Sequence, residues 1–159
     1  MGIKQVREYL KAWNKDRDVI EFEVSSATVE LAALALSTEE ERIAKTLSFK
    51  KGDVPILIVA AGNMKIDNRK YKEEFGCKAH MLAADEVKEL IGHEVGGVCP
   101  FGVKENVEIY LDVSLKNYDF IYPACGSANS AIKLSYNELE EISSPVRWVD
   151  VCKERSMSG

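Results

Sequence analysis

RIAKTLSFKKGDVPILIVAAGNMKI, residues 42–66, carries the strongest strand signals in the chain. Residues 43–49 form one expected strand, and the nearly continuous apolar run 54–61 is typical of a strand buried on both faces. Gly62–Asn63 is a turn signal before a short third strand at 64–66. The stretch therefore predicts a β-sheet core around which the rest of the chain has to pack.

Helices and strands interleave irregularly on either side of that stretch. Expected helices cover residues 3–13 and 85–91. Three more follow from capping signals: one runs to residue 36 after the N-cap candidates Ser25, Ser26 and Thr28, one runs from Asp67 or Asn68 to Gly76, and one covers residues 136–142 after the Ser135-x-x-Glu138 capping box. A helical turn is expected after Ser37-x-x-Glu40. Further strands are expected at 19–24, 78–82, 107–113 (half-buried), 120–125, 131–134 and 146–151. This order favours a single mixed-sheet α/β (α+β) domain over residues 1–153, with a flexible tail at 154–159.

The composition is that of an ordinary globular domain, with 159 residues, 46% of them hydrophobic and 30% charged. The longest apolar run is far below the ~20 residues of a membrane span, and no signal peptide is visible, so cytoplasm is the expected location. The net charge of −5 argues against a sequence-independent nucleic-acid binder, although it allows contact with a few phosphates.

The cysteines are far apart and are expected to be reduced thiols, at least two of them in strands: Cys77, Cys99, Cys125 and Cys152. With His80 and His93 they show no zinc spacing, so we expect no metal. Cys99 lies six residues after His93, which raises a Cys-His nucleophile as one reading and a buried thiol beside proline as the other.

Lys45 is the first residue that could carry chemistry. It shares one side of the expected strand with Ile43, Leu47 and Phe49, so it stands in an apolar row. One reading is that its stem covers apolar surface while the ammonium reaches water. The other places the ammonium at the mouth of a pocket, where it stabilises a developing oxyanion or holds a phosphate.

The segment HEVGGVCPFGV, residues 93–103, is rich in glycine and almost uncharged. Gly96 and Gly97 would let a ligand approach the main chain, whose N–H groups can polarise a carbonyl, while Pro100 stiffens the loop. A plain connection that needs positive φ explains the same residues.

Two polar groups likewise have two readings. In PACGSANSAIKL, residues 123–134, Ser127 and Asn129 form either a turn or a second pocket wall. Lys65, Arg69 and Lys72 form either a solvated helix face or a patch that contacts phosphates.

Taken in order, these motifs resemble the YbaK/EbsC family, the free-standing relatives of the editing domain inserted in bacterial prolyl-tRNA synthetases. The matching pieces are an Ile-x-Lys-[Ser/Thr]-Leu strand, a buried strand, a Lys-x-Asp turn before a basic helix, GGVCPFG, an Ile-Tyr-x-Asp strand and a Gly-Ser-x-Asn segment, spread over roughly residues 20–152. The resemblance implies a compact domain whose mixed, mostly antiparallel sheet forms a barrel-like core with flanking helices. It also implies trans-editing, the hydrolysis of the ester between a wrong amino acid and tRNA, with no metal, cofactor or covalent nucleophile.

The same resemblance implies the site residues. Lys45 is the functional lysine, and Gly96 and Gly97 in the loop to Pro100 offer the backbone that holds the carbonyl and the terminal adenosine. The residues it places around the substrate are Ser26, Thr28, Thr46, Val98, Pro100, Phe101, Ser127 and Asn129. Lys65, Arg69 and Lys72 are the expected tRNA contacts, and the expected partner is the acceptor end of a mischarged tRNA.

Partners and substrate follow from the resemblance only in part. An aminoacyl-tRNA synthetase is a further expected partner, whereas DNA and membranes are not. Cysteine-specific members carry an acidic residue where this chain has Ala131, so the amino acid that is removed stays open. A binding module for a nucleotide or an aminoacyl-adenylate-like metabolite, without turnover, is the alternative class of function.

Overall fold

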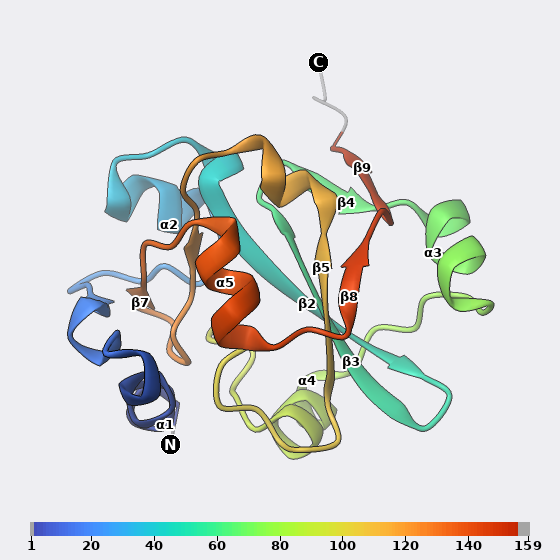
Figure 1. Cartoon of the computed structure of the whole chain (residues 1–159), viewed down its shortest axis with the longest axis horizontal. Coiled ribbons are helices and arrows are strands. Elements are labelled where there is room, and N and C mark those ends of the chain that lie inside the picture. Colours follow the sequence, from blue (N-terminus) through green and yellow to red (C-terminus); the bar gives the residue numbers. More distant parts are fainter. Residues whose placement is uncertain (1, 156–159) are drawn as a thin grey trace.

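A curled five-stranded sheet in the order β6-β2-β3-β5-β8 forms the centre of the computed structural model, which describes residues 2–155 (Figure 1). Its strands are β2 (Ile43–Lys51), β3 (Val54–Ala61), β5 (Glu108–Asp112), β6 (Tyr122–Pro123) and β8 (Arg147–Val149). In this sheet β2 and β3 pair antiparallel, whereas β6 with β2, β3 with β5, and β5 with β8 pair parallel. The sheet is mixed, as expected, but contains more parallel pairing than expected.

Two small antiparallel pairs flank this sheet. β1 (Ile20–Glu21) pairs with β7 (Ser130–Ala131), and β4 (Met64–Ile66) pairs with β9 (Cys152–Glu154). The strands expected at 19–24, 120–125, 131–134 and 146–151 are thus real but shorter, and 78–82 makes only an isolated bridge between Met81 and Phe49. A flexible tail was expected to begin at residue 154, but residue 154 belongs to β9, which pairs with the edge of β4. Residues 156–159 lie outside the described part of the chain.

The helices begin and end close to where their capping residues predict. They are α1 (Ile3–Leu10), α2 (Val29–Leu36), α3 (Asn68–Phe75), α4 (Ala84–Glu86), which continues as a π-helical turn to Ile91, and α5 (Tyr136–Ser143). The side chains of Thr28, Asp67 and Ser135 accept hydrogen bonds from N–H groups of the first turns of α2, α3 and α5. Ser37 is instead the left-handed residue that ends α2, so the capping role expected for it was wrong.

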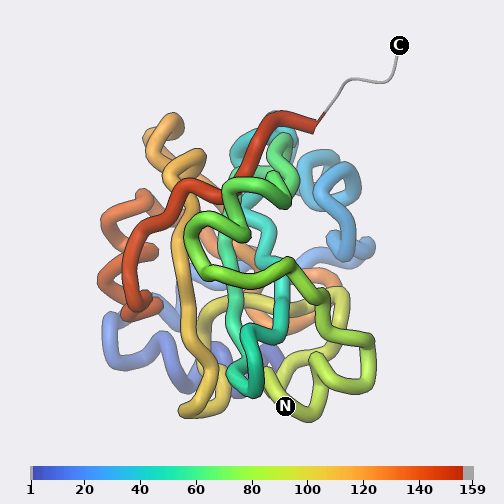
Figure 2. Tube along the Cα trace, turned by 90° about the vertical axis from the view of Figure 1, so that its right-hand side faces the viewer, coloured from blue at the N-terminus to red at the C-terminus, as the bar shows by residue number. Residues whose placement is uncertain are grey.

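The core lies on both faces of β3, as the apolar run predicts. Leu57 and Val59 pack in the cluster with α1, α4 and α5, and Ile58 packs against Tyr71 of α3 on the other face. Figure 2 shows α3 and the segment after it, in green, crossing in front of the sheet. The half-buried strand expected at 107–113 is buried on both faces in β5, because the α3 layer also covers Tyr110.

Candidate active site

One cavity, called the main cavity below because Lys45 and Thr46 line it, lies along the free edge of β2. β6 pairs only with the first two residues of β2, and the segment 80–82 meets the strand again further along, where Leu82 N–H donates to Ser48 O (3.1 Å). Between these two points lies a cavity of about 330 Å³, and residues 43–48 all line it. The cavity therefore occupies a gap in the sheet.

Small and apolar side chains from several segments form the remaining walls. They are Ser26, Ala27, Thr28, Val29 and Ala32 at α2, Met81, Leu82, Ala84 and Val87 near α4, Val95, Gly96 and Val98 in the glycine-rich loop, and Tyr122, Ala124, Ser130 and Ala131 near β6 and β7. Within residues 2–155, Lys45 is the one charged residue of this lining, and no carboxylate or imidazole joins it. The site thus offers hydroxyls, main-chain groups and one ammonium.

Lys45 borders the cavity, but its ammonium is turned toward β4. Its Nζ donates a hydrogen bond to the Met64 carbonyl, and the residue shares its face of β2 with Leu47 and Phe49, as the period of two predicts. Burial lowers the pKa of the Lys45 ammonium, and the nearby positive charge of Arg155 lowers that pKa further. The lysine is therefore a half-buried cation beside the cavity, and its surroundings favour the charged form less than water does.

The two adjacent glycines have different surroundings. Gly96 lines the cavity and is exposed, and a methyl group on it would lie 3.3 Å from Ala128 Cβ. Gly97 is buried, and a methyl group there would lie 2.5 Å from the Ser127 main-chain nitrogen and 2.7 Å from the Gly126 oxygen. Position 97 has no room for a side chain, because the loop packs directly on the main chain of the 126–127 turn.

The main-chain N–H of Gly97 is also engaged, since it donates to the Glu94 carbonyl at 2.9 Å. The structure therefore does not offer this N–H to a substrate carbonyl, contrary to the expectation from the glycine motif. Gly97 instead borders a second cavity of about 700 Å³, together with Gly96, Ser127 and His93. The glycine-rich loop therefore lies between the two cavities, and Gly96 lines both.

The structure brings only some of the expected substrate residues to the main cavity. Ser26, Thr28, Thr46 and Val98 line it together with Lys45 and Gly96. Phe101 is fully buried in the main core and Pro100 is buried, and neither lines the cavity. Their positions fit a role in anchoring the loop.

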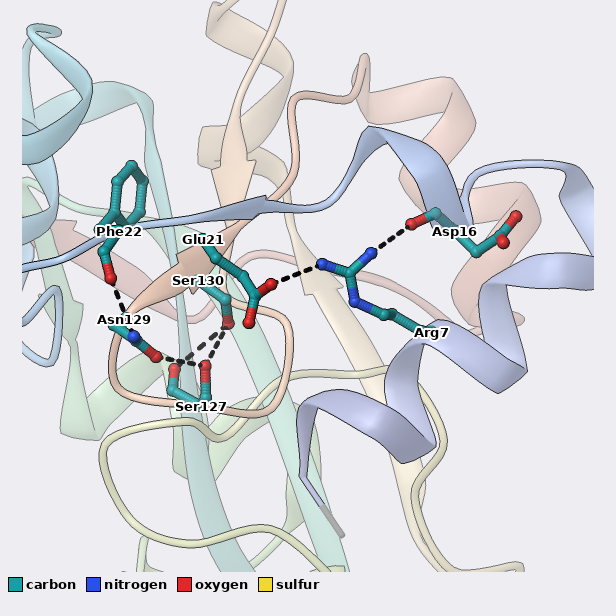
Figure 3. A network of polar contacts seen from close by, with 7 residues as sticks. All are labelled: Arg7, Asp16, Glu21, Phe22, Ser127, Asn129 and Ser130. Carbon is teal, nitrogen blue, oxygen red and sulfur yellow. Dashed lines mark hydrogen bonds and ion pairs between the residues drawn. The ribbon is translucent and has the colours of Figure 1, made fainter.

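Ser127 and Asn129 take part in a polar network that fixes the turn before β7 (Figure 3). Asn129 Nδ2 donates to the Phe22 carbonyl (2.9 Å), and Ser127 Oγ lies 2.9 Å from Asn129 Oδ1 and 2.7 Å from Ser130 Oγ. This network ties the turn to the segment after β1. Ser130, which the sequence analysis missed, is the member of this network that lines the main cavity.

Cys99 and His93 do meet, but not as a catalytic pair. The Cys99 Sγ lies 3.6 Å from His93 Nε2, and both side chains are buried. The same Nε2 lies 2.7 Å from the Phe101 carbonyl, which can only accept, so Nε2 carries the proton and cannot take one from the thiol. Burial also raises the pKa of Cys99 to about 12, which disfavours the thiolate.

The other cysteines are free as well, but only Cys152 lies in a strand, so the expectation of two strand cysteines was wrong. Across residues 2–155 no three His, Cys, Asp or Glu side chains gather in a way that could hold a metal ion. In that same range, no helix combines the length and apolar character needed to cross a membrane.

The basic residues Lys65, Arg69 and Lys72 are exposed on β4 and α3. Arg69 forms an i, i+4 ion pair with Glu73 at 3.3 Å, as is common on a solvated helix face. In Figure 1, α3 lies on the opposite side of the molecule from α2, whose first turn walls the cavity. The structure therefore does not gather these three residues at the cavity.

Ser48 is a further cavity residue that sequence reasoning missed. It lies two residues after Thr46 on the same face of β2, so the strand period could have identified it. Met81 and Val95 also line the cavity and are mostly exposed, at 67% and 54%. These two side chains reach the cavity because of the path that their loops take, and the sequence pattern does not predict that path.

Comparison with known proteins identifies the family. The sequence profile of the aminoacyl-tRNA editing domain matches residues 23–142. The uncharacterized protein YwhH of Bacillus subtilis (strain 168) is 56% identical over 155 residues, which is 97% of this chain and 99% of YwhH. A proline–tRNA ligase of Bacillus cereus (strain AH187) is 30% identical over 102 residues, or 64% of this chain, and that match covers only 18% of the ligase.

The fold leads to the same group of proteins. The crystal structure of a candidate trans-editing enzyme for prolyl tRNA synthetase superposes with a TM-score of 0.85 at 25% identity, covering 97% of each chain. The motifs identified in the sequence and the domain-wide match in structure agree with each other. The chain belongs to the aminoacyl-tRNA editing domain family.

Proposed function

We propose that this protein is a trans-editing deacylase that hydrolyses the ester between a wrong amino acid and tRNA. The observation that carries the proposal is the cavity at the β2 edge, which brings Lys45, Thr46 and Gly96 together in a chain of the editing family. Its volume of about 330 Å³ suits a small aminoacyl group. Editing is needed because a synthetic site rejects a substrate one methylene smaller by only ~1–3 kcal/mol.

The chemistry of the lining fits the hydrolysis of an activated ester. An aminoacyl ester needs little acid–base assistance, and no Asp, Glu or His among the described lining residues offers it. A bound water, assisted by the neighbouring ribose hydroxyl, attacks the carbonyl carbon. Main-chain N–H groups and the Lys45 ammonium, which keeps two N–H donors besides the one bonded to the Met64 carbonyl, then stabilise the negative charge. Losing one such donor typically lowers the rate ~10²–10³-fold.

Binding of the tRNA is proposed to use its acceptor end. A net charge of −5 fits contact with few phosphates, because a long nucleic-acid interface would require a basic surface. Lys65, Arg69 and Lys72 are candidate contacts to the tRNA body, since none of the three lines the cavity. A synthetase partner and location in the cytoplasm belong to the same proposal.

A panel of mischarged tRNAs tests this function. Purified protein is mixed with each tRNA, and the loss of the ester is followed against the spontaneous rate. Faster hydrolysis of at least one mischarged tRNA is expected. The absence of acid–base side chains also suits a module that only binds an aminoacyl or nucleotide ligand; such a module would protect the ester and slow its hydrolysis.

A further inference from the structure

The polar main-chain groups of Thr46 point away from β3, toward the open edge of β2. Further along the strand, Ser48 and Lys50 turn outward: Ser48 C=O accepts from Leu82 N–H at 3.1 Å, and Lys50 N–H donates to His80 O at 2.9 Å. These directions alternate with a period of two along a strand that is paired antiparallel. Thr46 therefore presents its N–H and C=O to the same edge.

No hydrogen bond within residues 2–155 satisfies these groups. β6 pairs with β2 no further than Ala44, and the segment 80–82 joins it only at Ser48, so Thr46 falls between the two. The Thr46 Oγ1 is buried and also has no hydrogen-bond partner in this range. Because a polar group without a hydrogen-bond partner is unfavourable away from water, a ligand that pairs with Thr46 gains from the arrangement.

The main cavity gives a ligand access to this edge. Successive side chains of a strand point to opposite faces, yet residues 43–48 line the cavity without a break. A cavity on one face of the strand would contact every second residue. The main cavity therefore runs along the edge of β2, where no neighbouring strand covers the main chain. The α-ammonium of an amino acid also needs an acceptor, and no carboxylate of the described residues lines the cavity.

We propose that Thr46 binds the aminoacyl group as a strand edge binds one residue of a neighbouring strand. Its C=O accepts from the α-ammonium, and its N–H donates to the ester carbonyl oxygen. An amino acid ester carries both groups on one Cα, which is the spacing of a residue in an antiparallel hydrogen-bonded pair. This inference rests on the proposed function and supplies the N–H donor that Gly97, already bonded to Glu94, does not.

The substrate class that follows is an aminoacyl ester with a free α-amino group. The first experiment compares tRNA carrying one susceptible amino acid with the same tRNA after N-acetylation and with the matching α-hydroxyacyl ester. The hydroxyacyl ester lacks the ammonium but adds no bulk. Both changes are expected to lower kcat/KM by about 10–150-fold, the value of a hydrogen bond to a charged group. Equal hydrolysis of all three esters would overturn the subsite.

The second experiment removes the Thr46 N–H and keeps the side chain by introducing an α-hydroxy acid at position 46, which turns the 45–46 amide into an ester. Deacylation is expected to fall about 10²-fold. The matched control is the same replacement at Lys50, which loses the hydrogen bond to His80 on the same edge but outside the cavity lining. Full activity of the Thr46 ester, or an equal loss in the Lys50 ester, would refute the proposal.

A third measurement separates this inference from the proposed function. If the wild-type protein hydrolyses no mischarged tRNA, the proposed function fails by itself. The subsite is then tested by titrating ¹⁵N-labelled protein with a non-hydrolysable, amide-linked aminoacyl-adenosine. A shift of the Thr46 amide resonance, with the Lys50 resonance unchanged, supports the subsite, and an unmoved Thr46 resonance rejects it.

Discussion

Replacing Gly97 by alanine tests whether bare backbone at this position serves the fold. The added Cβ would lie 2.5 Å from the Ser127 nitrogen and 2.6 and 2.7 Å from the carbon and oxygen of Gly126. All three are main-chain atoms, so the loop or the turn has to move. Overpacking of this kind typically costs ~1–3 kcal/mol. At about 2–4 °C for each kcal/mol in a chain of this size, Tm should fall by about 2–12 °C.

Gly96→Ala is the matched control, because it adds the same methyl group one residue earlier. That methyl would lie 3.3 Å from Ala128 Cβ and 3.4 Å from Ala27 Cβ, and both alanines are exposed, so they have room to shift by a few tenths of an ångström. We expect a Tm within about 2 °C of the wild type. Because Gly96 and Ala27 line the main cavity, deacylation should nevertheless fall, by about 10–200-fold for one methyl group in a pocket.

Thermal unfolding followed by circular dichroism gives Tm, and single-turnover deacylation at a temperature where both variants are folded gives the rate. The two variants should separate, with stability lost in Gly97→Ala and activity lost in Gly96→Ala. If Gly97→Ala unfolds at the wild-type temperature, the contact between the loop and the 126–127 turn is not the reason for that glycine. If Gly96→Ala keeps full activity, Gly96 does not border the bound substrate.

Three further predictions concern Lys45, Cys99 and His93. Lys45→Met should lower deacylation at least ~10²-fold with little change in Tm, because it keeps the apolar stem; retained activity would mean that the ammonium is not used. Cys99→Ser should stay active, and iodoacetamide at about pH 8 should label the partly exposed Cys77 but not Cys99, whose pKa is raised by burial to about 12; rapid labelling of Cys99 would argue against that burial. Burial lowers the pKa of His93, so the unfolded state takes up a proton that the native state does not, and the free energy of unfolding should fall as the pH drops below about 6.5. His93→Gln should flatten this slope in urea unfolding, and an unchanged slope would assign it to other groups.

The sequence determined most of the local structure of this protein. The limits of β3 and β4 and the caps of α3 and α5 lie where the apolar run, the Gly62–Asn63 turn, Asp67 and Ser135 predict them. These features depend on neighbouring residues and on side chains that pair with nearby main-chain groups, which a linear pattern contains. The order of motifs was also enough to indicate the editing family.

Only the tertiary structure decided which residues share a cavity. The sequence pattern puts Lys45, Thr46, Gly96 and Gly97 in one site. In the structure Gly97 supports packing beside the second cavity, while Lys45 lines the first cavity with its ammonium on a carbonyl of β4. The gap at Thr46 arises because β6 stops early and the segment 80–82 joins late, and both events depend on where distant segments pack. A linear pattern shows that a strand is present, but unpaired edges are created by contacts between segments far apart in the chain.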